Sequence, residues 1–194
     1  TRTTTLFPYT TLFRSGQADK SELFYWNQSL IKNADIIQGF RLKLIQSANV
    51  FFQRHSHQEI NKFFINYQPS AISAEKLEKL YVDELQSGHT KCGPHLDDFS
   101  LNYSDFETED KNLAFWGSRG QQRLAVLALR LAQINYLEEE YKEEPVLLLD
   151  DIFSELDEEH REIVVSICDK YQTLFTSADE AVINYLPTAQ ILKI

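Results

Sequence analysis

Two carboxylates stand side by side directly after a short apolar run. Asp150 and Asp151 follow Val146-Leu147-Leu148-Leu149. Such a run indicates a buried strand, and α/β sheets bind ligands at the carboxyl ends of their strands. One carboxylate there could hold Mg²⁺, and its neighbour could orient or deprotonate a water that attacks a terminal phosphate. The alternative is a polar helix cap, which does not explain why two acids adjoin an apolar run.

A second group of residues with possible chemistry lies at the expected start of a helix. Ser118 and Gln121 have the spacing of a capping box. Gly120 is unexpected within a first turn, because glycine costs about 1 kcal/mol in a helix, but it would let a ligand approach the backbone. The free N–H groups and dipole of a helix start favour a phosphate, and Arg119 and Arg123 add positive charge. The pattern therefore fits either a simple cap or a phosphate-binding turn.

The loop that would complete a nucleotide site is absent from the sequence. No G-x-x-x-x-G-K-[ST] pattern occurs in the 194 residues, and that glycine-rich loop is the element that cradles the phosphates in many nucleotide-binding enzymes. The two motifs above would therefore supply only part of a nucleotide site. We predict that this chain alone neither binds ATP tightly nor hydrolyses it.

The charge is concentrated in one segment. Residues 138–162 contain 12 acids against Lys142 and Arg161, which accounts for the whole net charge of -10. A broadly basic nucleic-acid surface is therefore excluded. No apolar run approaches the roughly 20 residues of a membrane-spanning helix, so no membrane partner is expected. The two cysteines, which are far apart and show no metal spacing, indicate an intracellular protein.

The elements that must position these residues follow from apolar periodicity and turn signals. Helix, apolar strand, helix and strand alternate in the second half, which is typical of an α/β layer with a parallel sheet. We expect helices over 21–60, 74–85, 118–141 and 157–170, and strands over 61–67, 99–103, 145–149, 173–176 and 190–194.

Three parts are expected along the chain. Residues 1–15 repeat Thr-Thr-Leu-Phe, at 4–7 and again at 10–13. They are interpreted as a non-native segment derived from a sequencing adaptor. Residues 16–86 would form a helical arm with one strand. Residues 87–194 would form a lobe that carries both candidate motifs.

Four segments in order resemble the RecF family, bacterial recombination-repair ATPases related to SMC proteins. They are Gly88-x-Thr90-x-x-Gly93-Pro94-His95-Leu96-Asp97-Asp98, Gly117 to Arg123, Leu147 to Asp157, and Gln172 to Thr176. The resemblance covers about residues 21–180. Leu96 departs from it, since the family usually carries arginine there. The implied fold is the C-terminal lobe of an ABC-type ATPase, a parallel sheet with flanking helices, plus an N-terminal helical arm.

The resemblance also implies roles for particular residues. The signature turn would contact ATP held by a second subunit, through Ser118, Arg119, Gly120 and Gln121. Asp150 would serve Mg²⁺, and Asp151 would stand at the catalytic position. The D-loop would be Ser154, Glu155, Leu156 and Asp157. Thr176 and Ser177 would occupy the switch position, where many ABC enzymes have a histidine.

The function implied by the resemblance is that of a slow, ATP-gated clamp in DNA repair, replication and the SOS response. The expected partners are DNA at single-strand gaps and junctions, a second copy in an ATP-dependent homodimer, and recombination mediator proteins, in the cytoplasm. Two alternatives stay open. One is another SMC-like ATPase of chromosome maintenance or defence, and the other is a non-catalytic interaction module.

Overall fold

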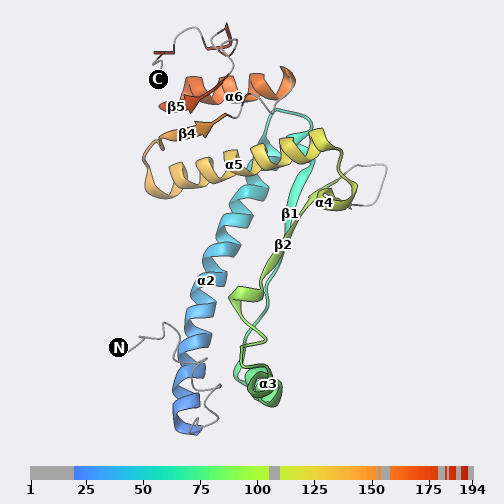
Figure 1. Cartoon of the computed structure of the whole chain (residues 1–194), viewed down its shortest axis with the longest axis vertical. Coiled ribbons are helices and arrows are strands. Elements are labelled where there is room, and N and C mark those ends of the chain that lie inside the picture. The colour runs from blue at the N-terminus through green and yellow to red at the C-terminus, as the bar shows by residue number, and fades with distance from the viewer. Residues whose placement is uncertain are drawn as a thin grey trace.

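The structure, a computed structural model, describes residues 20–104, 110–151, 153, 158–178, 182, 184–186 and 189–191. Within these residues one long helix, α2 (Lys20–Arg54), runs along an antiparallel sheet and meets a second long helix, α5 (Arg119–Tyr141), at its upper end (Figure 1). The parallel strands near the C-terminus lie on the side of α5 opposite α2. The expected combination of a helical arm with a parallel sheet and flanking helices is confirmed.

The arm is the helix α2, Lys20–Arg54. The helix was expected to continue to Ile60, but it ends at Arg54 and is followed by a turn and the short helix η1, Ile60–Lys62. In that turn the Nδ1 atom of His55 accepts from the N–H of His57 at 3.2 Å, and the Nδ1 atom of His57 accepts from the N–H of Glu59 at 3.3 Å. Side chains that capture nearby backbone groups in this way compete with helix continuation.

Three antiparallel strands lie along the arm. They are β1, Phe63–Gln68, β2, Asp98–Tyr103, and β3, Lys111–Asn112, in the order β1-β2-β3. Phe63 pairs with Tyr103 at one end of the β1–β2 ladder, and Gln68 pairs with Asp98 at the other. The helix α3, Ala74–Ser87, and the short helix η2, Pro94–Leu96, lie between β1 and β2 in the sequence. β3 is too short to give a pattern in the sequence, and we did not predict it.

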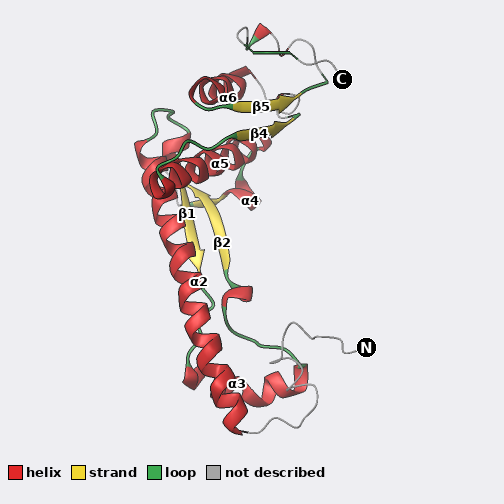
Figure 2. Ribbon diagram, turned by 90° about the vertical axis from the view of Figure 1, so that its left-hand side faces the viewer, coloured by secondary structure: helices red, strands yellow, loops and turns green. Residues whose placement is uncertain are grey.

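The α/β part begins with the short helix α4, Leu113–Trp116, and the long helix α5, Arg119–Tyr141. The strand β4, Leu147–Asp150, the helix α6, Glu158–Lys170, and the strand β5, Thr173–Thr176, follow. β4 and β5 are parallel, as expected, and Leu147 pairs with Thr173. Figure 2 shows the two strands side by side, with α5 below β4 and α6 next to β5. The strand expected over 190–194 is not formed by residues 190 and 191, and 192–194 lie outside the described residues.

α5 separates two hydrophobic cores. Its small side chains, Ala125, Ala128 and Ala132, pack with Phe52 of α2 and Phe63 of β1 in the first core. Small residues let helices approach closely, which accounts for an alanine-rich helix at this crossing. The other face of α5 presents Leu127 and Leu131 to the second core, which also contains Phe153, Val164, Val182 and Leu186. The first core therefore includes side chains from both sides of the boundary predicted at residue 86, which itself stays a prediction.

One face of the β4–β5 pair is open. Leu149 and Phe175 pack into the second core, whereas Leu148 is 75% exposed and its register partner Leu174 is 60% exposed. Parallel sheets are normally covered on both faces, so two exposed leucines on one face of such a pair are unusual. Among the described helices, none is long and apolar enough to cross a membrane.

Candidate functional site

The two acids lie at the carboxyl end of β4. Asp150 is the last residue of the strand and pairs with Thr176, the last residue of β5. The hydroxyl of Thr176 donates to Oδ1 of Asp150 at 2.5 Å. The N–H of Asp151 donates to both the hydroxyl and the carbonyl oxygen of Thr176, each at 3.2 Å. The parallel pairing therefore brings the predicted metal position, the predicted catalytic position and the first residue of the predicted switch together.

The backbone turns sharply at Asp151. Its φ of 46° lies in the left-handed region, which costs a non-glycine residue roughly 1 kcal/mol or more. The two hydrogen bonds to Thr176 hold this conformation. Asp150 and Asp151 are both exposed, so the strand ends with two carboxylates that solvent and ligands can reach.

The chemistry of this donor set fits Mg²⁺. The described residues contain no group of three or more His, Cys, Asp or Glu side chains that could hold a metal ion by themselves. Magnesium in phosphate-transfer sites is usually held by one or two carboxylates together with phosphate oxygens and water. A pair of accessible carboxylates at a strand end meets that requirement, provided that a nucleotide supplies the remaining ligands.

Ser118 is the N-cap of α5, as the capping-box interpretation predicts. Its hydroxyl accepts from the N–H of Gln121 at 3.2 Å, and the side-chain oxygen of Gln121 accepts from the N–H of Ser118 at 3.0 Å. A Cβ atom added at Gly120 would meet only the Ser118 hydroxyl, at 3.9 Å. No steric crowding among the described residues therefore requires a glycine at 120, and the first turn of α5, with the exposed Arg119, is open to an approaching group.

The connection that leads into this turn is tight. A Cβ atom at Gly117 would lie 2.7 Å from the carbonyl oxygen of Leu113. That oxygen also accepts from the N–H of Gly117 at 3.0 Å and from Nε2 of Gln122 at 2.9 Å. Leu113 itself is buried in the first core. The start of α5 is therefore fixed to the body of the chain.

The Ser118 turn and the two acids do not meet within the described residues. α5 has 23 residues, which corresponds to roughly 35 Å at the rise of an α-helix. The turn is at the α4 end of that helix, whereas β4 begins near its other end and runs back along it (Figure 1). Ser118 and Gln121 bond to one another, and Asp150 bonds to Thr176. The proposed D-loop, Ser154, Glu155, Leu156 and Asp157, lies outside the described residues, and Ser177 is exposed beside Thr176.

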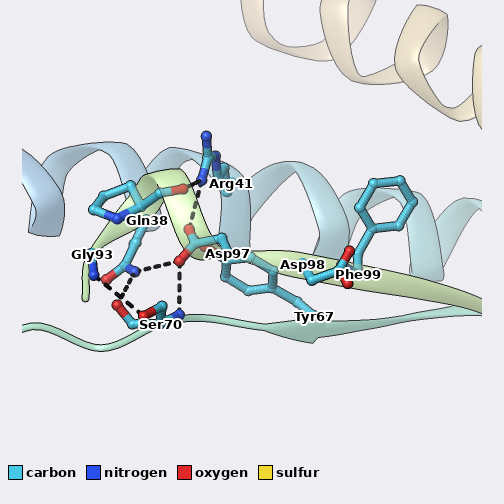
Figure 3. A network of polar contacts seen from close by, with 9 residues as sticks. Gln38, Arg41, Tyr67, Ser70, Gly93, Asp97, Asp98 and Phe99 are labelled. Carbon is cyan, nitrogen blue, oxygen red and sulfur yellow. Dashed lines mark hydrogen bonds and ion pairs between the residues drawn. The ribbon is translucent and has the colours of Figure 1, made fainter. Parts of the chain in front are cut away.

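A third polar site, around Asp97, was not assigned from the sequence. Figure 3 shows this carboxylate between α2 and the strands. Oδ1 accepts from Nε2 of Gln38 at 2.7 Å and from the N–H of Ser70 at 2.8 Å. Oδ2 accepts from Nη1 of Arg41 at 2.6 Å and from the hydroxyl of Tyr67 at 2.5 Å. The Asp97 side chain is only 3% exposed.

The hydrogen bonds around Asp97 determine its ionisation. Burial alone would raise the pKa of this carboxyl, but the four donors, led by the Tyr67 hydroxyl, outweigh burial and lower the pKa to about 2. Arg41 also donates to the carbonyl oxygen of Pro94 at 2.5 Å, and Gly93 has a φ of 115°, which favours glycine. The Gly93–Asp97 segment is therefore a structural joint between the arm and the strands.

Comparison with known proteins identifies the family. No family model matches the chain. The chain is 33% identical over 175 residues to the DNA replication and repair protein RecF of Leptospira biflexa, a match that covers 86% of the chain and 46% of that protein. It is 30% identical over 200 residues to RecF of Halothermothrix orenii, covering 93% of the chain and 52% of that protein. The chain belongs to the RecF family. It spans about half the length of the relatives that it matches.

Solved RecF structures have the same fold. A structure described as the recombination mediator protein RecF-ATPrS in the RecFOR pathway matches with a TM-score of 0.66 at 26% identity, covering 88% of this chain and 50% of that one. The corresponding RecF-ATP structure gives the same TM-score. The expected ABC-type ATPase fold is thereby confirmed.

The structure also locates the departure of this chain from the usual RecF motif. Leu96, at the position where arginine is usual, is 50% exposed on η2. The guanidinium that contacts Asp97 comes from Arg41 of α2. The Gly-Pro-His-x-Asp-Asp pattern was the signal that could have led to this site, but the donors on α2 and β1 are too far away in the sequence to be paired with it by inspection.

Proposed function

We propose that this chain supplies the signature turn, Ser118 to Gln121, and the acid-bearing strand β4 of a RecF-type ATP-dependent DNA repair protein. The observation that carries the proposal is the pair of accessible carboxylates at the end of β4, held by Thr176 of the parallel strand β5. The two solved RecF structures, described as RecF-ATPrS and RecF-ATP, support ATP as the nucleotide.

In this proposal Asp150 and Asp151 have different roles at the nucleotide. Asp150 holds Mg²⁺, directly or through water, and Asp151 orients the water that attacks the terminal phosphate. Mg²⁺, when bound, neutralises charge on the phosphate oxygens. Thr176 and Ser177 are at the switch position and offer hydroxyls where an imidazole would otherwise stand, and residues 154–157 form the D-loop.

The signature turn acts on a nucleotide bound by another subunit. Ser118, Arg119, Gly120 and Gln121 present a hydroxyl, a positive charge and an open helix start, which suit a phosphate. The separation of this turn from the acids in the described part of the chain supports a contact across a homodimer. ATP would then close the dimer, and hydrolysis would release it.

The biological substrate in this proposal is gapped or branched DNA, in the cytoplasm, with recombination mediator proteins as partners. The RecFOR description of a solved relative supports mediator partners. The acidic segment 138–162 argues that DNA is contacted elsewhere, because phosphates bind to basic surfaces.

The test compares variants in the complete gene product. Asp150→Asn and Ser118→Arg are each expected to lower magnesium-dependent ATP hydrolysis at least about a hundredfold. Ser73→Arg is the matched control, because Ser73 caps α3 through the N–H of Lys76 but lies away from the site. Equal loss of activity in Ser118→Arg and Ser73→Arg would show that Ser118 acts only as a helix cap, which would contradict the proposal.

A further inference from the structure

Thr176 is placed to control the geometry of both acids. Its hydroxyl donates to Oδ1 of Asp150 at 2.5 Å and accepts from the N–H of Asp151 at 3.2 Å. A hydroxyl can donate one hydrogen bond and accept others at the same time, so one oxygen atom serves both neighbours. We propose that Thr176 is a positioning residue that orients the Asp150 carboxylate toward a divalent cation. This inference rests on the proposed function.

The surroundings of Thr176 argue against a packing role. In β5, Thr173 and Phe175 are half-buried, whereas Leu174 and Thr176 are exposed on the opposite face. The neighbour of Thr176 in the register is Asp150, which is also exposed. An exposed side chain at the end of a strand adds little to the core. The hydroxyl is therefore the distinctive part of this residue.

The hydrogen bond restricts the Asp150 side chain. Because Oδ1 accepts a hydrogen bond from Thr176 of β5, the carboxylate cannot rotate freely about the Cβ–Cγ bond of Asp150. The other oxygen has no donor among the described residues and is available to a cation. Groups that hold metal ligands in this way typically change metal affinity by 10- to 100-fold when they are removed.

The backbone at Asp151 provides an internal control. Its N–H is shared between the hydroxyl and the carbonyl oxygen of Thr176. Replacing threonine with valine removes only the hydroxyl, keeps the β-branched shape that strands favour, and leaves the carbonyl acceptor in place. Thr176→Val therefore isolates the hydroxyl, and Thr176→Ser keeps it.

The experiment uses the complete gene product with a non-hydrolysable ATP analogue, and Mn²⁺ as the probe, followed through paramagnetic broadening of the backbone amide signals of Asp150 and Asp151. Thr176→Val is expected to weaken the local Mn²⁺ affinity about tenfold, and Thr176→Ser to stay within about twofold of the wild type. The urea midpoints of unfolding should be the same for all three. Hydrogen exchange at the Asp151 amide should be faster in Thr176→Val and unchanged in Thr176→Ser.

Asp150→Asn separates this inference from the proposal on which it rests. If Asp150→Asn weakens Mn²⁺ binding but Thr176→Val does not, the positioning role is overturned and the metal site stands. If Asp150→Asn has no effect, the metal site itself is wrong, and the inference falls with it. Equal weakening in Thr176→Val and Thr176→Ser would also overturn the role of the hydroxyl.

Discussion

The replacement of Asp97 by asparagine should destabilise the chain strongly. The carboxylate is 3% exposed and accepts four hydrogen bonds. Its pKa, lowered from 3.8 to about 2, corresponds to about 2 kcal/mol of folding free energy carried by the charged form. An asparagine NH₂ group would also face donors rather than acceptors. We expect Asp97→Asn to lower the free energy of unfolding by roughly 2–4 kcal/mol at pH 7.

The stability difference between the wild type and Asp97→Asn should also change with pH in a defined direction. Because the pKa of Asp97 is lower in the folded state, its contribution is complete above the ordinary pKa of 3.8 and is lost as the pH falls toward 2. In urea unfolding followed by tryptophan fluorescence, the gap between wild type and Asp97→Asn should be constant from pH 7 to pH 5. It should then shrink below about pH 4.

Asp98→Asn is the matched control for Asp97→Asn. Asp98 is exposed and accepts from the N–H of Phe99 at 2.8 Å, a bond that an amide oxygen can also accept. This variant should stay within about 0.5 kcal/mol of the wild type. A cost below 0.5 kcal/mol for Asp97→Asn, or a gap that does not change with pH, would refute the account of Asp97 as a structural joint.

Two further predictions concern packing. Leu148→Asn, at a leucine that is 75% exposed, should change the free energy of unfolding by less than about 0.5 kcal/mol and raise solubility. Leu147→Ala, at a leucine that is 7% exposed, should lower the free energy of unfolding by about 2–5 kcal/mol in the same urea titrations. Gly117→Ala should cost roughly 1–3 kcal/mol, because its Cβ would lie 2.7 Å from the Leu113 carbonyl oxygen. Gly39→Ala, which meets nothing within 4 Å in helix α2, should instead add about 0.5–1 kcal/mol of thermal stability. The packing account fails if the two leucine variants behave alike, or if the two glycine variants do.

The sequence predicted the elements whose signals are local. The Ser118 capping box, the long helix after it, and the apolar strand that ends in Asp150 are all formed. Each depends on residues within a few positions of one another, so spacing alone could identify it. Helix ends were less predictable, because α2 stops where His55 and His57 capture backbone groups rather than at a proline or glycine.

The contacts that join distant segments could not be predicted. The bond from Thr176 to Asp150 depends on the register of two parallel strands, which an intervening helix sets. The carboxylate of Asp97 meets donors that lie 27 to 59 residues away, and nothing in a local pattern indicates that four of them converge. The roles of Ser118, Asp150 and the D-loop residues in nucleotide chemistry stay predictions.

The central claim is that the signature turn of one subunit serves the acids of another. The most direct test mixes two inactive variants of the complete gene product, Asp150→Asn and Ser118→Arg, in equal amounts. In a mixed dimer one composite site would combine an intact Asp150 with an intact Ser118 from the other subunit. Since half of the dimers would be mixed and each would have one working site of two, the account predicts about a quarter of wild-type ATP hydrolysis. If the mixture is as inactive as either variant alone, the signature turn does not act across the dimer.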